Sequence, residues 1–205
     1  MGQELADALK LDEIRFIPSA NPPHKSAPVI SAEHRTAMVD LAIANNPLFC
    51  VDDREMIRSG PSYTIDTLES LRYELGQEVS LVLLMGSDAF TQLHTWHRWE
   101  SIIDLCHISL VERPKGKSHI NCTSNPKEML PKHLELLLQE HYTENGDDLH
   151  SSRAGFITMQ HITALDISST LIRELMLQQQ SINYLLPDCV MEYIKLHQLY
   201  ISSIN

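Results

Sequence analysis

The sequence predicts an α/β fold in which helices cover both faces of a parallel sheet. Helix and strand patterns alternate along the 205 residues, as they do in successive βαβ units with right-handed crossovers. The segment "SLVLLMG" at 80–86 is almost continuously apolar, which is typical of a strand buried on both faces. Polar loops follow the expected strands, and ligands of such sheets bind outside the carboxyl ends of the strands.

The first half of the chain begins with an amphipathic helix at 3–10, followed by the strand candidate "IRFIP" at 14–18. Ser31 is a suitable N-cap for a helix that runs to Asn45, with Met38, Leu41 and Ala42 on its apolar face. The short apolar run "LFCV" at 48–51 predicts another strand.

The second half repeats the alternation. An amphipathic helix is predicted at 63–75, before the apolar strand at 80–86. Further strands are predicted at 107–113, where Pro114 ends the run, and at 155–160. Helices complete the pattern at 169–178 and 187–197.

Composition favours a single reduced, cytoplasmic domain over residues 1–205. Residues 115–153 are more polar and predict a helical insertion rather than a second domain. The net charge of -11 argues against a nucleic-acid surface, and no apolar run approaches the ~20 residues of a membrane span. The four cysteines form no C-x-x-C pair, and the eleven histidines lack a recognisable metal-ligand spacing. We therefore expect no metal site built from protein side chains.

The segment "DISSTLIRE" at 166–174 predicts a helix start that carries an unusual arginine. Ser168, Ser169 and Thr170 offer hydroxyls for capping, but Arg173 places a cation near the positive end of the helix dipole. Arg173 could pair with a nearby carboxylate. Alternatively, free amides, hydroxyls and the guanidinium could converge on an anion such as a phosphate.

Two further loops follow predicted strands. In "NPPHK", two prolines stiffen the backbone before His24 and Lys25, which could form a solvated turn or contact a phosphate. In "MGSDAF", Gly86 permits close approach of a ligand to the backbone beside Ser87. Asp88 could accept hydrogen bonds from a ribose or a base, or cap a helix that begins at Ala89.

Aromatic residues gather after the same strand and at one helix start. The segment "HTWHRW" contains both tryptophans of the chain; Trp99 is expected in packing, whereas Trp96 could stack on a flat heteroaromatic ring. In "GPSYT", Ser62 could cap the helix that begins near Tyr63 and Thr64. The free amides of that helix could instead hold a ligand carboxylate.

Together these motifs resemble a known family. "ISSTLIR" is similar to the ISSTxIR signature of nucleotidyltransferases with a Rossmann-like fold, shared with phosphopantetheine and other pyridine-nucleotide adenylyltransferases. "FIPSANPPHK", "SYT", "GSDAF" and "TWHRW", in this order, resemble bacterial nicotinate-mononucleotide adenylyltransferase. The resemblance runs from residue 3 to the C-terminus. It implies transfer of AMP from ATP to nicotinate mononucleotide, giving deamido-NAD and pyrophosphate in NAD biosynthesis.

The resemblance also implies roles for individual residues. ATP would be bound through its phosphates by Ser168, Ser169, Thr170 and Arg173, with His24 and Lys25 nearby and Asp88 on the adenosine side. Nicotinate mononucleotide would be bound by backbone amides of Thr64 and His97, by stacking on Trp96, and by Arg113 near its phosphate. Tyr63, Gly86 and Ser87 would support these groups. His97 stands where the family commonly has a tyrosine, and a backbone role survives that change.

Mg²⁺ is expected to arrive with ATP, and a homodimer is possible. Two alternative acceptors are nicotinamide mononucleotide and pantetheine phosphate, and a non-catalytic nucleotide-binding protein is the alternative from another class. Reaction rates with the three acceptors separate the three enzymes. ATP binding without turnover would indicate the non-catalytic protein.

The N-terminus departs from the family pattern. The family opens with a strand and a Gly-rich turn of sequence GGTFDPxHxGH, and this sequence contains neither. Typical lengths of a strand and a helical turn give about 20 residues for the absent segment. The natural protein could begin upstream, or the chain could be a truncation or a shortened paralogue. We expect the neighbouring strands to be left unpaired and this chain to have little or no adenylyltransferase activity.

Overall fold

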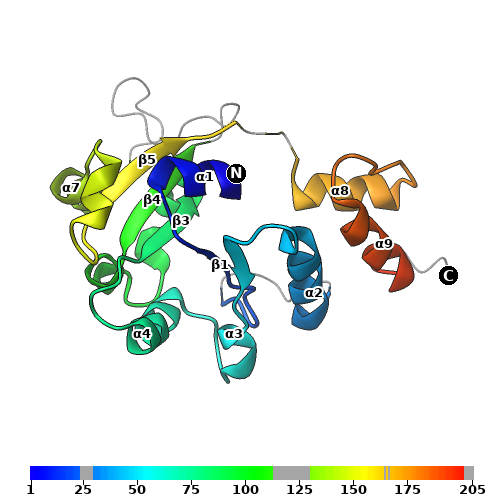
Figure 1. Ribbon diagram of the computed structural model, residues 1–205, viewed down its shortest axis with the longest axis horizontal. Coiled ribbons are helices and arrows are strands. Elements are labelled where there is room, and N and C mark those ends of the chain that lie inside the picture. The colour runs from blue at the N-terminus through cyan, green and yellow to red at the C-terminus, as the bar shows by residue number, and fades with distance from the viewer. Residues whose placement is uncertain (24–29, 113–129, 164, 166, 201–205) are drawn as a thin grey trace. The chain divides into compact units, whose positions relative to one another are not determined.

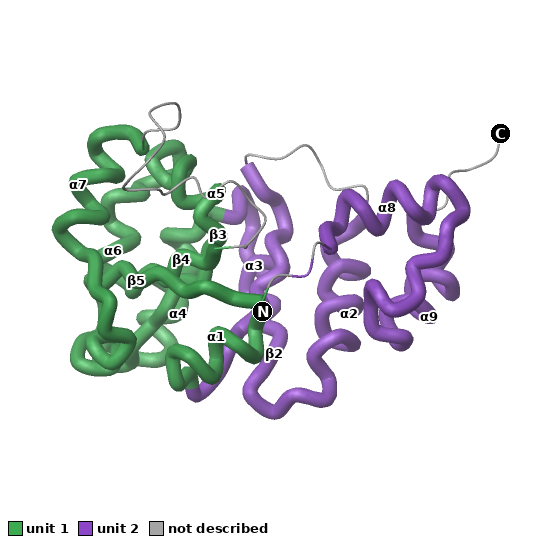
Figure 2. The backbone as a smooth tube through the Cα atoms, turned by 90° about the horizontal axis from the view of Figure 1, so that it is seen from above, with its two compact units in different colours: residues 1–11, 63–164 green, residues 12–62, 165–205 purple. Residues whose placement is uncertain are grey.

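The computed structural model describes residues 1–23, 30–112, 130–163, 165 and 167–200. The chain forms two compact units, each built from two separate stretches of sequence (Figure 2). Unit 1 comprises Met1–Leu11 and Tyr63–Ala164, and unit 2 comprises Asp12–Ser62 and Leu165–Asn205. The interpretation of residues 1–205 as one domain with an insertion, and that of a missing first strand, stay predictions.

Unit 1 is built on a parallel sheet of three strands in the order β3-β4-β5 (Figure 1). The strands are β3 (Val82–Gly86), β4 (His107–Glu112) and β5 (Ile157–His161). The central strand β4 is buried over its first five residues, whereas the first three residues of β3 are only half-buried. The prediction that 80–86 is buried on both faces was therefore wrong for this part, because β3 pairs with β4 alone among the described strands.

Helices surround this sheet and supply most of the core of unit 1. They are α1 (Gly2–Leu9), α4 (Thr64–Leu75), α5 (Ser87–Thr91), α6 (Ile102–Leu105) and α7 (Lys132–His141), with short 3₁₀ turns η1 (Leu93–Thr95), η2 (Trp99–Ser101) and η3 (Gly146–His150). Helix α7 lies in the polar region where a helix was expected. Leu5 of α1, Ile65 of α4 and Leu134 of α7 are almost fully buried, so each helix presents an apolar face to the core.

Unit 2 pairs two short parallel strands, β1 (Ile14–Phe16) and β2 (Phe49–Val51), and adds four helices among its described residues. These are α2 (Ala32–Ile43), α3 (Arg54–Ile57), α8 (Ser169–Leu177) and α9 (Asp188–Leu196). Ser31 caps α2 as predicted, because its Oγ accepts a hydrogen bond from the His34 amide at 3.5 Å. The parallel strands and surrounding helices of both units confirm the predicted α/β class.

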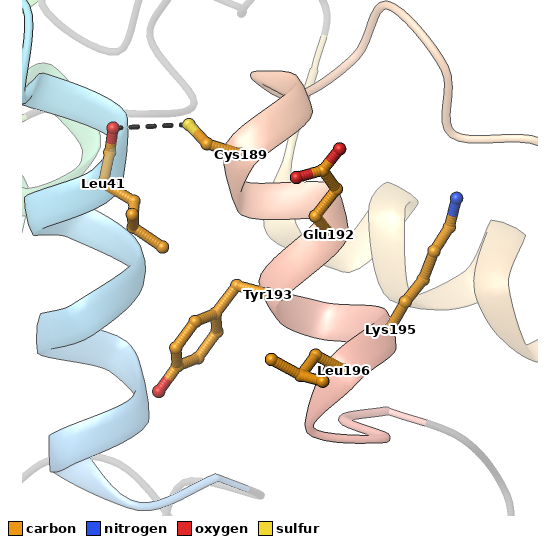
Figure 3. A pocket seen from close by; sticks show the side chains of 6 residues that line it. All are labelled: Leu41, Cys189, Glu192, Tyr193, Lys195 and Leu196. Carbon is orange, nitrogen blue, oxygen red and sulfur yellow. Dashed lines mark hydrogen bonds between the residues drawn. The ribbon is translucent and has the colours of Figure 1, made fainter.

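Helices α2 and α9 pack together around a shallow cavity of about 490 Å³ (Figure 3). Tyr193 points from α9 toward α2, and its hydroxyl lies 3.0 Å from Nδ1 of His34. The Cys189 thiol donates to the Leu41 carbonyl at 3.4 Å. Within the described ranges, every helix is too short or too polar to cross a membrane.

The cysteines in the described part of the chain are free thiols, as the spacing predicted: Cys50, Cys106 and Cys189. Burial raises the pKa of Cys106 to about 12, so this thiol stays protonated at neutral pH and behaves as a small apolar side chain.

One buried arginine connects the beginnings of all three strands of unit 1. Arg72, in the last turn of α4, is 3% exposed. Its guanidinium donates to the carbonyl of Leu105 at 2.6 and 2.8 Å, to that of Arg153 at 2.7 Å, and to that of Val79. These carbonyls precede β4, β5 and β3 respectively. Burial lowers the pKa of the Arg72 guanidinium, which nevertheless stays charged at neutral pH.

We predict that Arg72→Lys lowers the free energy of unfolding by about 3 kcal/mol, because an ammonium cannot reach all three carbonyls and leaves buried acceptors unpaired. Denaturant unfolding of the protein measures the loss. Tyr73→Ala is the control, since its neighbouring side chain is 94% exposed and the change should stay within about 0.5 kcal/mol. Equal stability of Arg72→Lys and the unmodified protein would refute the role of the guanidinium.

Candidate functional site

Seven of the predicted site residues that the structure describes lie in unit 1, at the starts of α4 and α5 and in the segment that follows α5. They are Tyr63, Thr64, Gly86, Ser87, Asp88, Trp96 and His97. The residues that follow β3 lie at the carboxyl end of the parallel sheet, where ligands of such sheets bind.

The start of α4 brings Tyr63 and His97 together. Tyr63 is the N-cap residue and provides no side-chain cap; its ring instead lies 4.5 Å from that of His97, tilted by 33°. The prediction that Ser62 caps this helix was wrong, because its Oγ accepts a hydrogen bond from the Asn21 amide at 3.0 Å. The helix therefore begins at Thr64 without a side chain that covers its first amides.

Strand β3 passes directly into α5, so the expected position of the helix start was wrong. The helix begins at Ser87 rather than Ala89, and its N-cap is Gly86 without a side-chain cap. Asp88 therefore does not cap it but lies in its first turn, exposed. A Cβ atom at Gly86 would overlap the Asp88 carboxylate, so the glycine leaves room for that carboxylate beside the backbone.

Residues 94–99, which include both tryptophans and are called the tryptophan loop below, are held on both sides of Trp96. The Trp96 amide donates to the Leu93 carbonyl at 2.9 Å, and its side chain is half-buried. Arg98 adopts a left-handed conformation, with φ of 51°, and its guanidinium lies 2.8 Å from the Glu69 carboxylate on α4. Trp99 packs against His133 of α7, which agrees with the packing role expected for it.

In unit 2, the start of α8 is capped as predicted. Ser168 Oγ accepts a hydrogen bond from the Leu171 amide at 3.1 Å. The Arg173 side chain turns back along the helix, where Nε donates to the Ser169 carbonyl at 2.9 Å and Nη2 approaches Ser169 Oγ at 3.4 Å. Ser168, Ser169 and Thr170 are exposed, so their hydroxyls and the guanidinium gather at an accessible helix N-terminus.

A buried carboxylate network follows β2. Asp52 accepts hydrogen bonds from Arg54 at 2.6 to 3.1 Å and pairs with Arg15 at 3.4 Å. Burial alone would raise the pKa of Asp52, but the hydrogen bonds and charge of Arg54 lower it below 3.8 overall. This network contributes stability above the unfolded pKa, and the contribution is lost as the pH falls through the folded pKa.

Three of the predicted residues, His24, Lys25 and Arg113, lie outside the described residues. In the described ranges there is no group of three or more His, Cys, Asp or Glu residues that could hold a metal ion. The sequence reasoning missed the Arg98–Glu69 pair and the contact of His133 with the tryptophan loop. Both join residues far apart in the sequence, and no local pattern indicates them.

We predict that Gly86→Ala destabilises the protein by about 0.5 to 1 kcal/mol, because the exposed Asp88 carboxylate that a Cβ atom would overlap must turn to another rotamer. The same substitution should cost much less in an Asp88→Ala background, where the overlapping carboxylate is absent. Denaturant unfolding of the four proteins in this double-mutant cycle measures the coupling. An equal cost in both backgrounds would show that Asp88 does not occupy the space beside Gly86.

Comparisons with known proteins place the chain in a family. The cytidylyltransferase-like family model matches residues 2–175. Probable nicotinate-nucleotide adenylyltransferases of Pseudomonas syringae pv. tomato and Dechloromonas aromatica are 42% and 41% identical to it, over 96% and 99% of this chain and 84% and 90% of their own lengths. The structure of Plasmodium falciparum nicotinic acid mononucleotide adenylyltransferase complexed with NaAD has a similar fold, with a TM-score of 0.65 at 18% identity, covering 97% of this chain and 89% of that one. This chain therefore belongs to the nicotinate-nucleotide adenylyltransferase family, within the cytidylyltransferase-like group of proteins.

Proposed function

We propose that this protein transfers AMP from ATP to nicotinate mononucleotide. A phosphate oxygen of the mononucleotide attacks the α-phosphorus of ATP and forms the new P–O bond. The bond between the α-phosphorus and the bridging oxygen breaks, and pyrophosphate leaves with the electron pair. The products are deamido-NAD and pyrophosphate, so the protein would act in NAD biosynthesis. The observation that carries the proposal is the family membership, with 41–42% identity over nearly the whole chain.

The start of α8 suits the phosphates of ATP. The exposed hydroxyls of Ser169 and Thr170 lie at the positive end of the helix, beside the Arg173 guanidinium. Such groups bind oxyanions and stabilise charge on phosphoryl oxygens. We assign Ser168 the role of cap, His24 and Lys25 a place near the phosphates, and Asp88 the adenosine side.

The start of α4 and the tryptophan loop suit the acceptor. The first amides of α4, at Thr64, and the backbone of His97 would donate to the nicotinate carboxylate, which favours a helix N-terminus. The half-buried Trp96 would stack on the pyridine ring. Arg113 would contact the mononucleotide phosphate. Tyr63 supports this arrangement through its ring contact with His97.

The reaction requires no side-chain nucleophile, since phosphoryl transfer is accelerated by positioning and by stabilisation of charge. Magnesium would enter as part of the ATP substrate, with phosphate oxygens and water as most of its ligands. The described residues provide no group of three His, Cys, Asp or Glu side chains for a protein cage. A cytoplasmic location and a homodimer remain parts of the proposal.

The acceptor test compares nicotinate mononucleotide, nicotinamide mononucleotide and pantetheine phosphate, each with magnesium and ATP. Pyrophosphate release is measured with each acceptor. We expect nicotinate mononucleotide to be the preferred acceptor. Preference for another acceptor, or no turnover with any of the three, contradicts the proposed function.

For the ATP side, we predict that Arg173→Ala weakens ATP binding roughly tenfold or more, since it removes a charge-assisted contact worth about 1.5 to 3 kcal/mol. Its effect on folding should be small, because its hydrogen bonds go only to Ser169 one turn earlier. Calorimetric titration with ATP and thermal unfolding measure the two effects. Ser168→Ala is the control for stability, because it removes a cap worth about 1 kcal/mol and should lower the unfolding temperature. An unchanged ATP affinity of Arg173→Ala would refute the assignment.

A further inference from the structure

One side chain of α7 contacts the tryptophan loop on both sides of its centre. The His133 ring lies 5.0 Å from that of His94, at an angle of 60°, and 5.4 Å from that of Trp99, at 49°. In the sequence, His94 precedes Trp96 by two residues and Trp99 follows it by three. A single ring thus fixes the two ends of the short segment that carries Trp96 and His97.

The contact between His133 and His94 is one of ring packing rather than hydrogen bonding. Nδ1 of His94 is buried and has no hydrogen-bond partner in the described structure. The His94 ring therefore holds its place through its faces and edges, which meet the His133 ring in a tilted, nearly T-shaped arrangement. An aromatic ring without a titratable nitrogen should replace His133 in this role.

Helix α7 is a firm support for that ring. Leu134 is fully buried and Leu138 is 7% exposed, so both anchor α7 in the core of unit 1. At the end of the helix, Nδ1 of His141 lies 2.7 Å from the Gly155 carbonyl, just before β5. His133 itself is exposed. Its removal should therefore change the loop more than the stability of the unit.

The opposite side of the loop is held by α4. The His97 ring contacts Tyr63 at 4.5 Å, and Arg98 pairs with Glu69 at 2.8 Å. The loop is thus held between α4 and α7, and His133 is the ring that α7 contributes. A loop ordered before the ligand arrives loses less conformational entropy on binding.

We propose that His133 is a positioning residue for acceptor recognition. By packing on His94 and Trp99, it fixes the loop so that the Trp96 ring and the His97 backbone are ready for the pyridine carboxylate. The inference rests on the proposed function, because it assigns His133 to the acceptor half of that site. The inference goes beyond the proposed function because it gives α7, a helix in the polar region of the sequence, a part in substrate selection.

The test uses the 205-residue chain and two variants at this position, His133→Ala and His133→Phe. Glu140→Ala, at an exposed position of the same helix, is the matched control. Hydrogen exchange of the backbone amides of residues 93–99 reports on the loop without any ligand. Intrinsic fluorescence reports on binding of nicotinate mononucleotide, since the only two tryptophans of the chain, Trp96 and Trp99, lie in this loop. ATP binding and thermal unfolding are measured in parallel.

We expect His133→Ala to speed exchange in the loop and to weaken nicotinate mononucleotide binding about three- to tenfold, the cost of ordering one or two side chains. ATP affinity and the unfolding temperature should stay close to those of the unmodified protein. His133→Phe should restore both loop protection and acceptor affinity, and Glu140→Ala should change neither.

The proposal is overturned by unchanged exchange and affinity in His133→Ala, by an equal loss of ATP affinity, or by failure of His133→Phe to restore the loop. If the unmodified protein gives no fluorescence response to nicotinate mononucleotide, the assigned acceptor site fails. Hydrogen exchange then still decides whether His133 holds the loop. The two results therefore separate an error in the proposed function from an error about His133.

Discussion

The arrangement of unit 1 depends on the burial of one charged side chain, Arg72. A guanidinium is costly to remove from water, and it is tolerated here because its donors meet the carbonyls of Val79, Leu105 and Arg153. These carbonyls lie at the amino ends of three parallel strands, and that of Arg153 also accepts a hydrogen bond from the Leu81 amide at 3.3 Å. Only the planar, forked arginine has the geometry for all three. The strand beginnings are thus tied to α4, and the strand ends at the opposite edge are left for ligands.

Helix α4 connects this structural constraint to the candidate site. Arg72 lies in its last turn, Glu69 pairs with Arg98 of the tryptophan loop, and Tyr63 at its start contacts His97. A helix of 12 residues is about 18 Å long and stiff over that length. The bonds that hold its C-terminal end therefore also set where its first amides lie. Packing at the amino ends of the strands and the proposed acceptor site therefore share one rigid element.

The sequence predicted the elements better than the contacts between them. Apolar periodicity located α4 and α8, and the hydroxyl of Ser168 correctly indicated a cap, because both signals are local. The Ser62 hydroxyl looked equally suitable, yet it bonds to Asn21, 41 residues earlier. Likewise, Asp88 looked suitable as a cap, yet the helix begins at Ser87 with Gly86 as its N-cap, so Asp88 falls inside the first turn. Local chemistry tells which residues can cap a helix, and tertiary contacts decide which ones do.

The orientation of the Arg173 side chain in α8 is set by contacts within one turn of the helix. Arg173 is a cation near a positive helix end, and it lies there because it bonds back to the Ser169 carbonyl and hydroxyl. Those acceptors are neutral, so they orient the guanidinium without cancelling its charge. An oxyanion that approaches the helix start therefore meets the helix dipole and a pre-oriented cation together. Pairing with a carboxylate would have removed this attraction, and among the described residues Arg173 has no such partner. The position that is unfavourable for the empty helix is thus the favourable one for the phosphate site proposed at this helix start.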